Sequence, residues 1–283
     1  MGMTETKLDF REVDRIIQNA LAEDIHEGDW STNSIVPENV KAEAFLKVKE
    51  DGIIAGLQVA EKVFKALDAD INFISQVNDG ERVEKGKIIA EITGSYRAIL
   101  TGERTALNFL QRMSGIATET AKYVEAVNGT KTQILDTRKT VPGLRILDKY
   151  SVKTGGGTNH RIGLFDMIML KDNHIKIAGG IKNAIAQVKS NIPKQLKIEV
   201  ETTTLDEVRE ALECGADIIM LDNMENKTML EAVNFIGGKA AVEASGNMTL
   251  DRVKEVAALG VDYISIGALT HSVKGLDIGQ YIK

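Results

Sequence analysis

The stretch LKIEVETTTLDEVREALECGADIIMLDN, residues 196–223, decides the fold. It opens with the apolar run Leu196–Val200, continues through a helical pattern between Thr204 and Gly215, and closes with the apolar run Ile218–Leu221. Threonine is a favourable helix N-cap, and glycine suits the left-handed position that follows a helix. The stretch therefore predicts a strand, a helix and a second strand in succession.

The same succession recurs along the chain. The first copy consists of Thr204–Val208, Gly215–Asp217 and the apolar run that follows. The second copy has the same order, with Thr249–Val253, Gly260–Asp262 and another apolar run. After Gly129, six short apolar runs alternate with helical patterns: Gln133–Leu135, Met167–Leu170, Leu196–Val200, Ile218–Leu221, Ala240–Val242 and Tyr263–Ile266. Most of these runs are too continuous for half-exposed antiparallel strands. They indicate strands buried on both faces, as in a parallel sheet covered by helices.

The first part of the chain follows a different pattern. Phe10–Glu23 has the apolar period of an amphipathic helix, and Val59–Leu67 is a further helical segment. Glu23–Thr32 is polar and is predicted to be a turn. Strand-like runs surround the second helical segment: Ala44–Val48, Ile71–Val77 and Ile88–Ile92. A long helix, roughly Glu103–Val127, is expected to connect this part to the rest.

Charged, polar or small residues stand at the carboxyl end of each of the six later runs. They are Asp136–Lys139, Lys171–His174, Glu199–Glu201, Asp222–Asn223, Glu243–Asn247 and Gly267–His271. Any strand end is polar where the chain leaves its core, but six in succession favour an active site. In parallel α/β barrels these ends share one face, where active sites lie. A doubly wound open sheet also fits the alternation, and the strand ends favour the barrel.

We therefore expect an α/β protein with an N-terminal domain over residues 1–113 and a barrel-like catalytic domain over residues 114–283. A chain of 283 residues is long enough for both. No apolar run approaches the roughly 18–20 residues of a membrane helix, and residues 1–10 contain acids without the apolar core of a signal peptide. The single cysteine, Cys214, lies in a helical pattern and is expected to be structural. The cytoplasm is the expected location, without a membrane partner.

The charge balance makes one cationic cluster informative. The formal net charge is −6, so the chain lacks the basic character typical of nucleic-acid binding, and no such partner is expected. Basic residues nevertheless cluster in one short stretch, among them Arg138, Lys139, Lys149, Lys153, His160, Arg161, Lys171 and His174. Such a cluster is either a solvated surface or a site for an anionic substrate, and its position at the strand ends favours the site.

The last two strand ends have the composition of a phosphate site. Ser245-Gly246-Asn247 and Gly267-Ala268 are small residues that let backbone N–H groups approach a ligand, although ordinary turns also use glycine. Glu201 and Asp222 end neighbouring runs, where their carboxylates suit Mg²⁺ or ribose hydroxyls. Ion pairs with Lys171 are the competing explanation.

A glycine-rich segment precedes the centre of the cationic cluster. Gly155–Gly157 lacks the flanking strand and helix of a nucleotide-binding fingerprint. We predict a mobile loop that presents His160 and Arg161 to a ligand.

Several segments closely resemble the quinolinate phosphoribosyltransferase family. They run in order through nearly the whole chain: EDIHEGDWST (Glu23–Thr32), GERTALNFLQRMSGIAT (Gly102–Thr118), DTRKTVPGLR (Asp136–Arg145), KTGGGTNHRIGLFDMIMLKDNH (Lys153–His174), IEVET (Ile198–Thr202), MLDNM (Met220–Met224), EASGN (Glu243–Asn247) and SIGALTHS (Ser265–Ser272). The resemblance implies an N-terminal α/β sandwich followed by an incomplete parallel barrel of the type II phosphoribosyltransferase kind. It implies transfer of phosphoribosyl from phosphoribosyl pyrophosphate to quinolinate with loss of carbon dioxide, a pentosyltransferase step in NAD biosynthesis.

The resemblance also assigns residues. Quinolinate contacts are implied at Arg138, Lys139, His160, Arg161 and Lys171, with Arg104 supplied by a neighbouring subunit of a homodimer or higher homo-oligomer. Thr137 is a further implied substrate-binding residue. The phosphoribosyl pyrophosphate site, with Mg²⁺, is implied at Lys139, Lys171, Glu201, Asp222, Ser245, Gly246, Asn247, Gly267, Ala268 and His271. Lys139, Lys171, Glu201 and Asp222 are the implied catalytic residues, and Glu201 and Asp222 the implied metal ligands.

Three other functions fit the same residues. A related phosphoribosyltransferase would take a pyridine with one carboxylate or another base. A Schiff-base aldolase would use Lys139 or Lys171 as its reactive amine. A pyridine-binding sensor would bind quinolinate without turnover.

Overall fold

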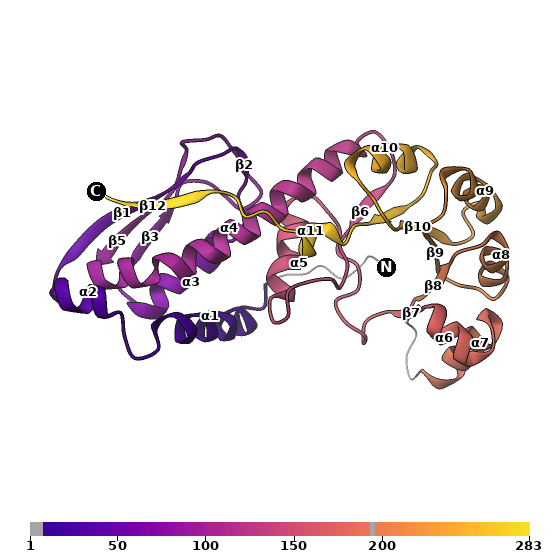
Figure 1. Ribbon diagram of the computed structural model, residues 1–283, viewed down its shortest axis with the longest axis horizontal. Coiled ribbons are helices and arrows are strands. Elements are labelled where there is room, and N and C mark those ends of the chain that lie inside the picture. The colour runs from indigo at the N-terminus through magenta and orange to yellow at the C-terminus, as the bar shows by residue number, and fades with distance from the viewer. Residues whose placement is uncertain (1–7, 193–195) are drawn as a thin grey trace. The chain divides into compact units, whose positions relative to one another are not determined.

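The computed structural model describes residues 8–192 and 196–283, in which helices and strands alternate (Figure 1). The chain forms two compact units whose segments interleave. Residues 122–139 and 157–267 form the barrel unit, and residues 8–121, 140–156 and 268–283 form the sandwich unit. The single domain boundary expected after residue 113 stays a prediction.

The sandwich unit contains a four-stranded antiparallel sheet in the order β12-β1-β5-β3. Its strands are β1 (Lys41–Val48), β3 (Asn72–Ser75), β5 (Ile88–Ser95) and β12 (Ile278–Ile282). β2 (Gly52–Ile53) and β4 (Arg82–Val83) form a separate antiparallel pair. The three strand-like runs predicted in this part are therefore strands, and the last strand of the chain joins them.

Six helices lie wholly or mostly in the described residues of the sandwich unit. They are α1 (Phe10–Ile25), α2 (Trp30–Ile35), α3 (Leu57–Leu67), α4 (Tyr96–Ala126), α5 (Arg145–Thr154) and α11 (Ala268–His271). Residues of α1, α3 and α4 share a core with the sheet. Val13 of α1, Phe64 of α3 and Leu46 of β1 lie in one core and are fully buried. The turn predicted at Glu23–Thr32 is only partly correct, because Asp29 accepts a hydrogen bond from the Thr32 amide and so begins α2.

The barrel unit contains six parallel strands in the order β6-β11-β10-β9-β8-β7. They are β6 (Gln133–Leu135), β7 (Ile168–Leu170), β8 (Ile198–Thr202), β9 (Ile218–Asp222), β10 (Ala241–Ser245) and β11 (Tyr263–Ser265). The first strand pairs with the last, and only a pairing of β6 with β7 would be needed to close the ring. This circular order excludes a doubly wound sheet, in which the first strand lies inside the sheet, and confirms the incomplete barrel.

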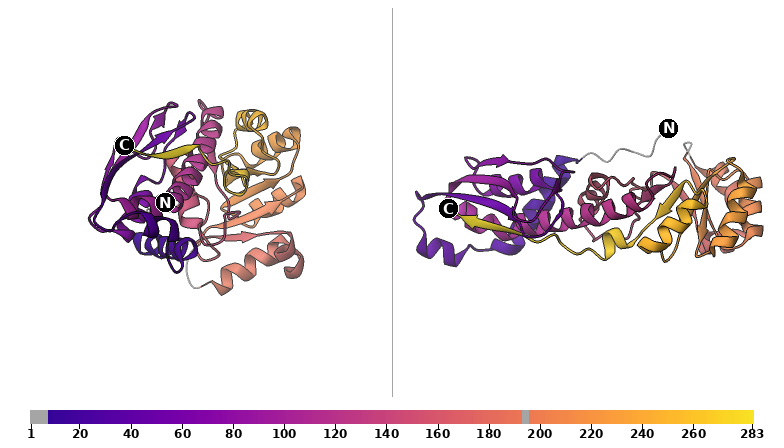
Figure 2. Two further views of the ribbon diagram at one scale, coloured as in Figure 1. Left: turned by 60° about the vertical axis from the view of Figure 1, so that its left-hand side comes forward. Right: turned by 90° about the horizontal axis from the view of Figure 1, so that it is seen from above.

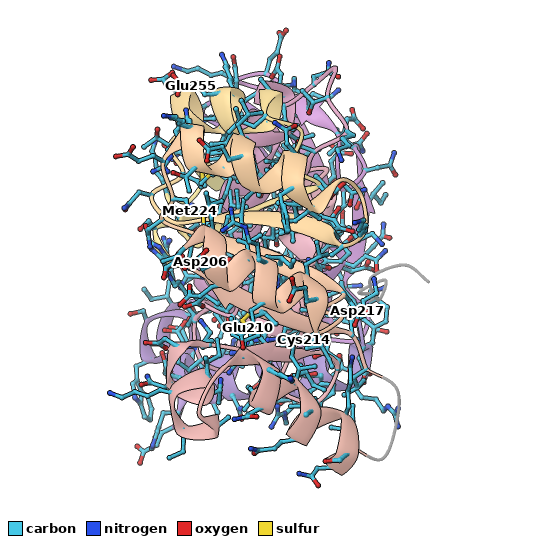
Figure 3. All side chains as sticks on the ribbon, turned by 90° about the vertical axis from the view of Figure 1, so that its right-hand side faces the viewer. Asp206, Glu210, Cys214, Asp217, Met224 and Glu255 are labelled. Carbon is cyan, nitrogen blue, oxygen red and sulfur yellow. The ribbon has the colours of Figure 1, made fainter. Side chains whose placement is uncertain are left out.

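Helices α6 (Asp172–Ala178), α7 (Ile181–Asn191), α8 (Leu205–Glu213), α9 (Asn226–Ile236) and α10 (Leu250–Ala258) follow the strands. Figure 2 shows α8 to α10 on the outer side of the strands. Side chains link neighbouring helices: Glu210 of α8, labelled in Figure 3, accepts from the Lys182 amide of α7 at 3.0 Å. Asn226 of α9 donates to Glu255 of α10 at 2.9 Å. Thr204 and Thr249 cap their helices as predicted.

The register of the strands separates two faces of this sheet. Glu201 and Glu243 both lie level with Met220, so acidic residues of β8 and β10 share one face with Asp222 of β9. The other face carries apolar residues that are fully buried, namely Val200, Ile219, Leu221, Ala244 and Ile264. The barrel interior is thus the polar face. Within residues 8–192 and 196–283, no helix combines the length and apolar character needed to cross a membrane.

Candidate active site

Two arginines of the barrel unit interact through their charges. Arg138 follows β6, Arg161 precedes β7, and both are half-buried. Arg161 donates to the Met167 carbonyl at 3.1 Å, which holds its guanidinium in place. Burial lowers the pKa of Arg161, and the positive charge of Arg138 lowers it further. Two guanidinium groups that repel each other in this way form a site suited to an anion.

Lys171 and Glu201 form an ion pair at the carboxyl ends of β7 and β8. The Lys171 Nζ donates to Glu201 Oε2 at 3.1 Å, and Lys171 is the N-cap of α6. The lysine side chain is half exposed, whereas the glutamate side chain is largely covered. The ion pair that competed with a ligand-binding role for Glu201 is therefore present in this structure.

Asn223 organises the loop that ends β10. Its backbone N–H donates to the Ser245 carbonyl at 2.9 Å, and its side-chain amide donates to Asp222 at 2.9 Å. Asn247 in turn donates to the Asn223 side-chain oxygen at 3.3 Å. Gly246 has a φ of 97°, and a Cβ there would lie 2.5 Å from Cγ of Asn223. The predicted loop Ser245–Asn247 thus packs against a residue to which the sequence assigned no role.

His160 lies deep in the barrel. Its side chain is 5% exposed, with Nε2 3.0 Å from Glu199 Oε2 and 3.3 Å from Glu243 Oε2. Its Nδ1 accepts from the Arg161 backbone N–H at 2.7 Å. Burial acts to lower the pKa of His160, but the hydrogen bonds and charges of the two glutamates outweigh it and raise the pKa to about 10. The Arg161 N–H opposes part of this rise, because it favours an unprotonated Nδ1.

Gly155–Gly157 forms a short loop as predicted, and its mobility stays a prediction. Gly155 ends α5, and Thr158 forms a parallel bridge with Leu135 of β6. The His160 backbone N–H then donates to Asp136 at 2.8 Å. Backbone pairing and a buried carboxylate therefore hold the segment that carries His160.

The barrel contains two carboxylates to which the sequence assigned no role, Glu199 and Glu243. Both side chains are fully buried. Burial and the negative charge of Glu243 raise the pKa of Glu199, against the attraction of His160 and Arg161. The available signal was a charged residue inside an apolar run, because glutamate is rarely buried without a partner.

The remaining predicted residues are distributed over both units. Thr137 accepts from the Lys139 amide at 3.0 Å, and the Lys139 side chain is exposed. Gly267 follows β11 in the barrel unit. Five residues belong to the sandwich unit: Arg104, exposed on α4; Ala268 and His271, on α11; and Lys149, buried, with Lys153, half-buried, on α5. Their contribution to the site stays a prediction.

The fold and the site together define an α/β-barrel protein with a cluster of cationic side chains in its barrel unit. Comparison with known proteins agrees. Residues 29–114 match the model of the quinolinate phosphoribosyl transferase N-terminal domain, and residues 116–280 match that of the C-terminal domain. The chain belongs to the quinolinate phosphoribosyl transferase family.

Individual relatives resemble the chain over most of their length. A chloroplastic nicotinate-nucleotide pyrophosphorylase (carboxylating) of Oryza sativa is 47% identical, over 94% of this chain and 76% of that protein. A probable nicotinate-nucleotide pyrophosphorylase (carboxylating) of Synechocystis is 44% identical, over 95% and 92%. The crystal structure of NadC from Streptococcus pyogenes superposes with a TM-score of 0.95 at 44% identity, and covers 99% of both chains.

Proposed function

We propose that this protein transfers the phosphoribosyl group of phosphoribosyl pyrophosphate to quinolinate and releases carbon dioxide. The products are nicotinate mononucleotide and pyrophosphate, in NAD biosynthesis. The observation that carries the proposal is the juxtaposition of Arg138 and Arg161, whose like charges favour a ligand with negative charge. Quinolinate has two adjacent carboxylates, and arginine binds carboxylates through two parallel hydrogen bonds.

The barrel residues divide between the two substrates. The quinolinate site comprises Arg138, Lys139, His160, Arg161 and Lys171, and Thr137 is a further residue of the substrate site. Phosphoribosyl pyrophosphate is bound by Lys139, Lys171, Glu201, Asp222, Ser245–Asn247, Gly267, Ala268 and His271. The small residues Ser245–Asn247 support this division, because they let phosphate oxygens approach backbone N–H groups. Gly246 itself is also required by its φ of 97° and by the Asn223 side chain packed against it.

The reaction depends on electrostatic stabilisation more than on proton transfer. The pyridine nitrogen of quinolinate attacks the anomeric carbon of the ribose, and the bond to pyrophosphate breaks. The sugar becomes positively charged in the transition state, which the carboxylates of Glu201 and Asp222 stabilise. The pyridinium ring that forms accepts the electron pair released when the adjacent carboxylate leaves as carbon dioxide. A proton from Lys139 or Lys171 then takes the place of the lost carboxylate on the ring.

The residues present suit Mg²⁺, which binds proteins through one or two carboxylates and completes its shell with water and substrate phosphates. Glu201 and Asp222 lie on neighbouring strands of one face and provide such carboxylates. The ion would neutralise the charge of the departing pyrophosphate. Because Lys171 pairs with Glu201, the lysine must move or share that carboxylate when an ion binds.

We also propose a homodimer in which Arg104 reaches the neighbour's quinolinate site, and a cytoplasmic location. The exposed position of Arg104 on α4 supports the first proposal, because a residue that enters another subunit must lie at the surface. The acidic net charge of −6 supports the absence of a nucleic-acid partner.

One assay tests the activity. The protein is incubated with quinolinate, phosphoribosyl pyrophosphate and Mg²⁺, and carbon dioxide and nicotinate mononucleotide are measured. Nicotinate replaces quinolinate in a parallel reaction. We expect turnover of quinolinate and little of nicotinate, because a missing carboxylate leaves buried cations unpaired. Equal specificity constants would indicate a phosphoribosyltransferase for another pyridine, and quinolinate binding without products would indicate a sensor.

A further inference from the structure

A pair of carboxylates is buried in the barrel below the strand-end site. Glu199 comes from β8 and Glu243 from β10, while β9 between them places Met220 on the same face. Both glutamates are fully buried, and each lies two residues before a predicted ligand-binding residue, Glu201 and Ser245. Side chains from alternate strands form such layers inside parallel barrels, and those layers are normally apolar.

A buried carboxylate is unfavourable unless opposite charge and hydrogen bonds offset the loss of water. His160 supplies that partner, since its Nε2 lies 3.0 Å from Glu199 and 3.3 Å from Glu243. The charge of Arg161 also acts on Glu199. Replacing a buried ion pair by apolar residues of similar size is often neutral for stability. The burial of Glu199 and Glu243 is therefore better explained by a role in positioning neighbouring residues than by stability alone.

The same histidine connects this layer to both arginines. Its Nδ1 accepts from the Arg161 backbone N–H at 2.7 Å, and its own backbone N–H donates to Asp136 at 2.8 Å. Asn159 donates to the second oxygen of Asp136 at 2.7 Å. Asp136 lies two residues before Arg138. One buried network thus holds the segments that carry Arg138 and Arg161.

We propose that Glu199 and Glu243 are positioning residues that, through Nε2 of His160, hold Arg138 and Arg161 at the spacing that two adjacent carboxylates require. The proposal rests on the proposed function. His160 then acts on the substrate through the segment it anchors, because both of its ring nitrogens face protein atoms. Loss of either glutamate should weaken quinolinate binding and leave the phosphoribosyl pyrophosphate site intact.

The test compares leucine and glutamine at each position. Glu199→Leu and Glu243→Leu remove the acceptor at similar size, whereas Glu199→Gln and Glu243→Gln keep an acceptor oxygen. We expect the leucine variants to raise the Kd of quinolinate by about 10- to 100-fold, the loss typical of a hydrogen bond to a charged group. The Kd of quinolinate for the glutamine variants should lie between the values for the leucine variants and for the parent protein. The Kd of phosphoribosyl pyrophosphate with Mg²⁺ should change less than about twofold in all four, well below the factor that one ordinary hydrogen bond represents. The matched control is Glu231→Gln, an exposed glutamate of α9.

The ring of His160 provides a second readout that does not depend on the variants. The chain has four histidines, so ¹⁵N-labelled imidazole signals can be assigned with His160→Asn. We expect Nε2 of His160 in the unsubstituted protein to carry a proton that exchanges slowly with water. In any leucine variant that folds, the exchange should become fast.

These results separate the two proposals. If the parent protein and Glu231→Gln fail to turn over quinolinate, the proposed function is wrong, whatever the ring signal shows. If turnover is normal but both glutamine variants and any folded leucine variant bind quinolinate as tightly as the parent, the positioning role is wrong. An unprotonated Nε2 in the parent protein would also overturn it.

Discussion

At the scale of single residues, the site contains two like charges, on Arg138 and Arg161, whose repulsion an anionic ligand would relieve. Arg138 and Arg161 lie near enough for the charge of one to lower the pKa of the other, and Arg161 is partly buried. Lys171 and Glu201 neutralise each other at 3.1 Å. An anion that pairs with the arginines relieves their repulsion, so a dicarboxylate ligand and these side chains stabilise each other.

Removing one of the two guanidinium groups should therefore affect one substrate only. We expect Arg138→Ala or Arg161→Ala to weaken quinolinate binding by about 2–5 kcal/mol, the loss seen when a buried charge loses its partner. Binding of phosphoribosyl pyrophosphate should persist. Isothermal titration calorimetry with each substrate measures both effects, and unchanged quinolinate affinity in both variants would contradict the assignment.

The strand-end acids should act on the other substrate. We expect Glu201→Ala and Asp222→Ala to slow phosphoribosyl transfer about 10²–10³-fold, as the loss of one electrostatic stabiliser does. Quinolinate affinity should stay nearly unchanged. Single-turnover kinetics at saturating substrates measures the step. Normal rates in both variants would mean that Glu201 only forms an ion pair with Lys171 and does not stabilise the transition state.

At the scale of structural elements, strands and loops set the spacing of these residues. Parallel pairing places Asp222 level with Ser245, and Asn223 joins the ends of β9 and β10 through the Ser245 carbonyl. Asn223 and Asn247 adopt positive φ angles of 52° and 49°, which asparagine tolerates better than most residues. Hydrogen bonds of Asn223 and Asn247 therefore shape the loop after β10.

Gly246→Ala tests this loop. The substitution places a Cβ against the Asn223 side chain at a φ of 97°, where L-residues are strained by about 1–3 kcal/mol. We expect a higher KM for phosphoribosyl pyrophosphate and a lower Tm, with quinolinate affinity retained. Gly238→Ala is the matched control, because it has a positive φ of 79° and open space around it. Equal KM values for the two variants would argue against a phosphate-binding role of the loop.

At the scale of the whole molecule, a buried ionisable network links folding to pH. The glutamates raise the pKa of His160 from 6.5 to about 10, although burial and the Arg161 amide act against them. A histidine whose pKa is raised by folding stabilises the native state fully below its unfolded pKa, and loses that contribution as pH rises through the folded value. The window is therefore from about pH 6.5 to pH 10.

Urea unfolding over this window measures the linkage. We expect the difference in unfolding free energy between the parent protein and His160→Gln to shrink as pH rises from 6.5 towards 10. Subtracting the variant removes the titration of groups that do not interact with His160, so the difference reports His160 together with its partners Glu199 and Glu243. A difference that stays constant with pH would mean that His160 does not lose a proton in this range.

Assembly determines whether the proposed site is complete in one chain. Arg104 is exposed on α4, and the proposed homodimer places it in the neighbour's site. Arg104→Ala and Lys171→Ala should each be nearly inactive. After equal mixing, about half of the dimers combine the two variants, and each holds one intact site, so activity should recover to about a quarter per subunit. Persistent inactivity despite confirmed subunit exchange would rule out the shared site.

The sequence by itself determined the six parallel strands, their helix caps at Thr204 and Thr249, and the acids and cations at the strand ends. These features are local, because the period of apolar residues and the choice of capping residue depend on near neighbours. The sequence did not predict the bridge that follows the glycines, since the pairing of Thr158 with Leu135 joins residues that are distant in sequence. Only the tertiary structure brought His160 between Glu199 and Glu243. The three side chains come from two strands and a loop, so their contact depends on the order and register of the strands.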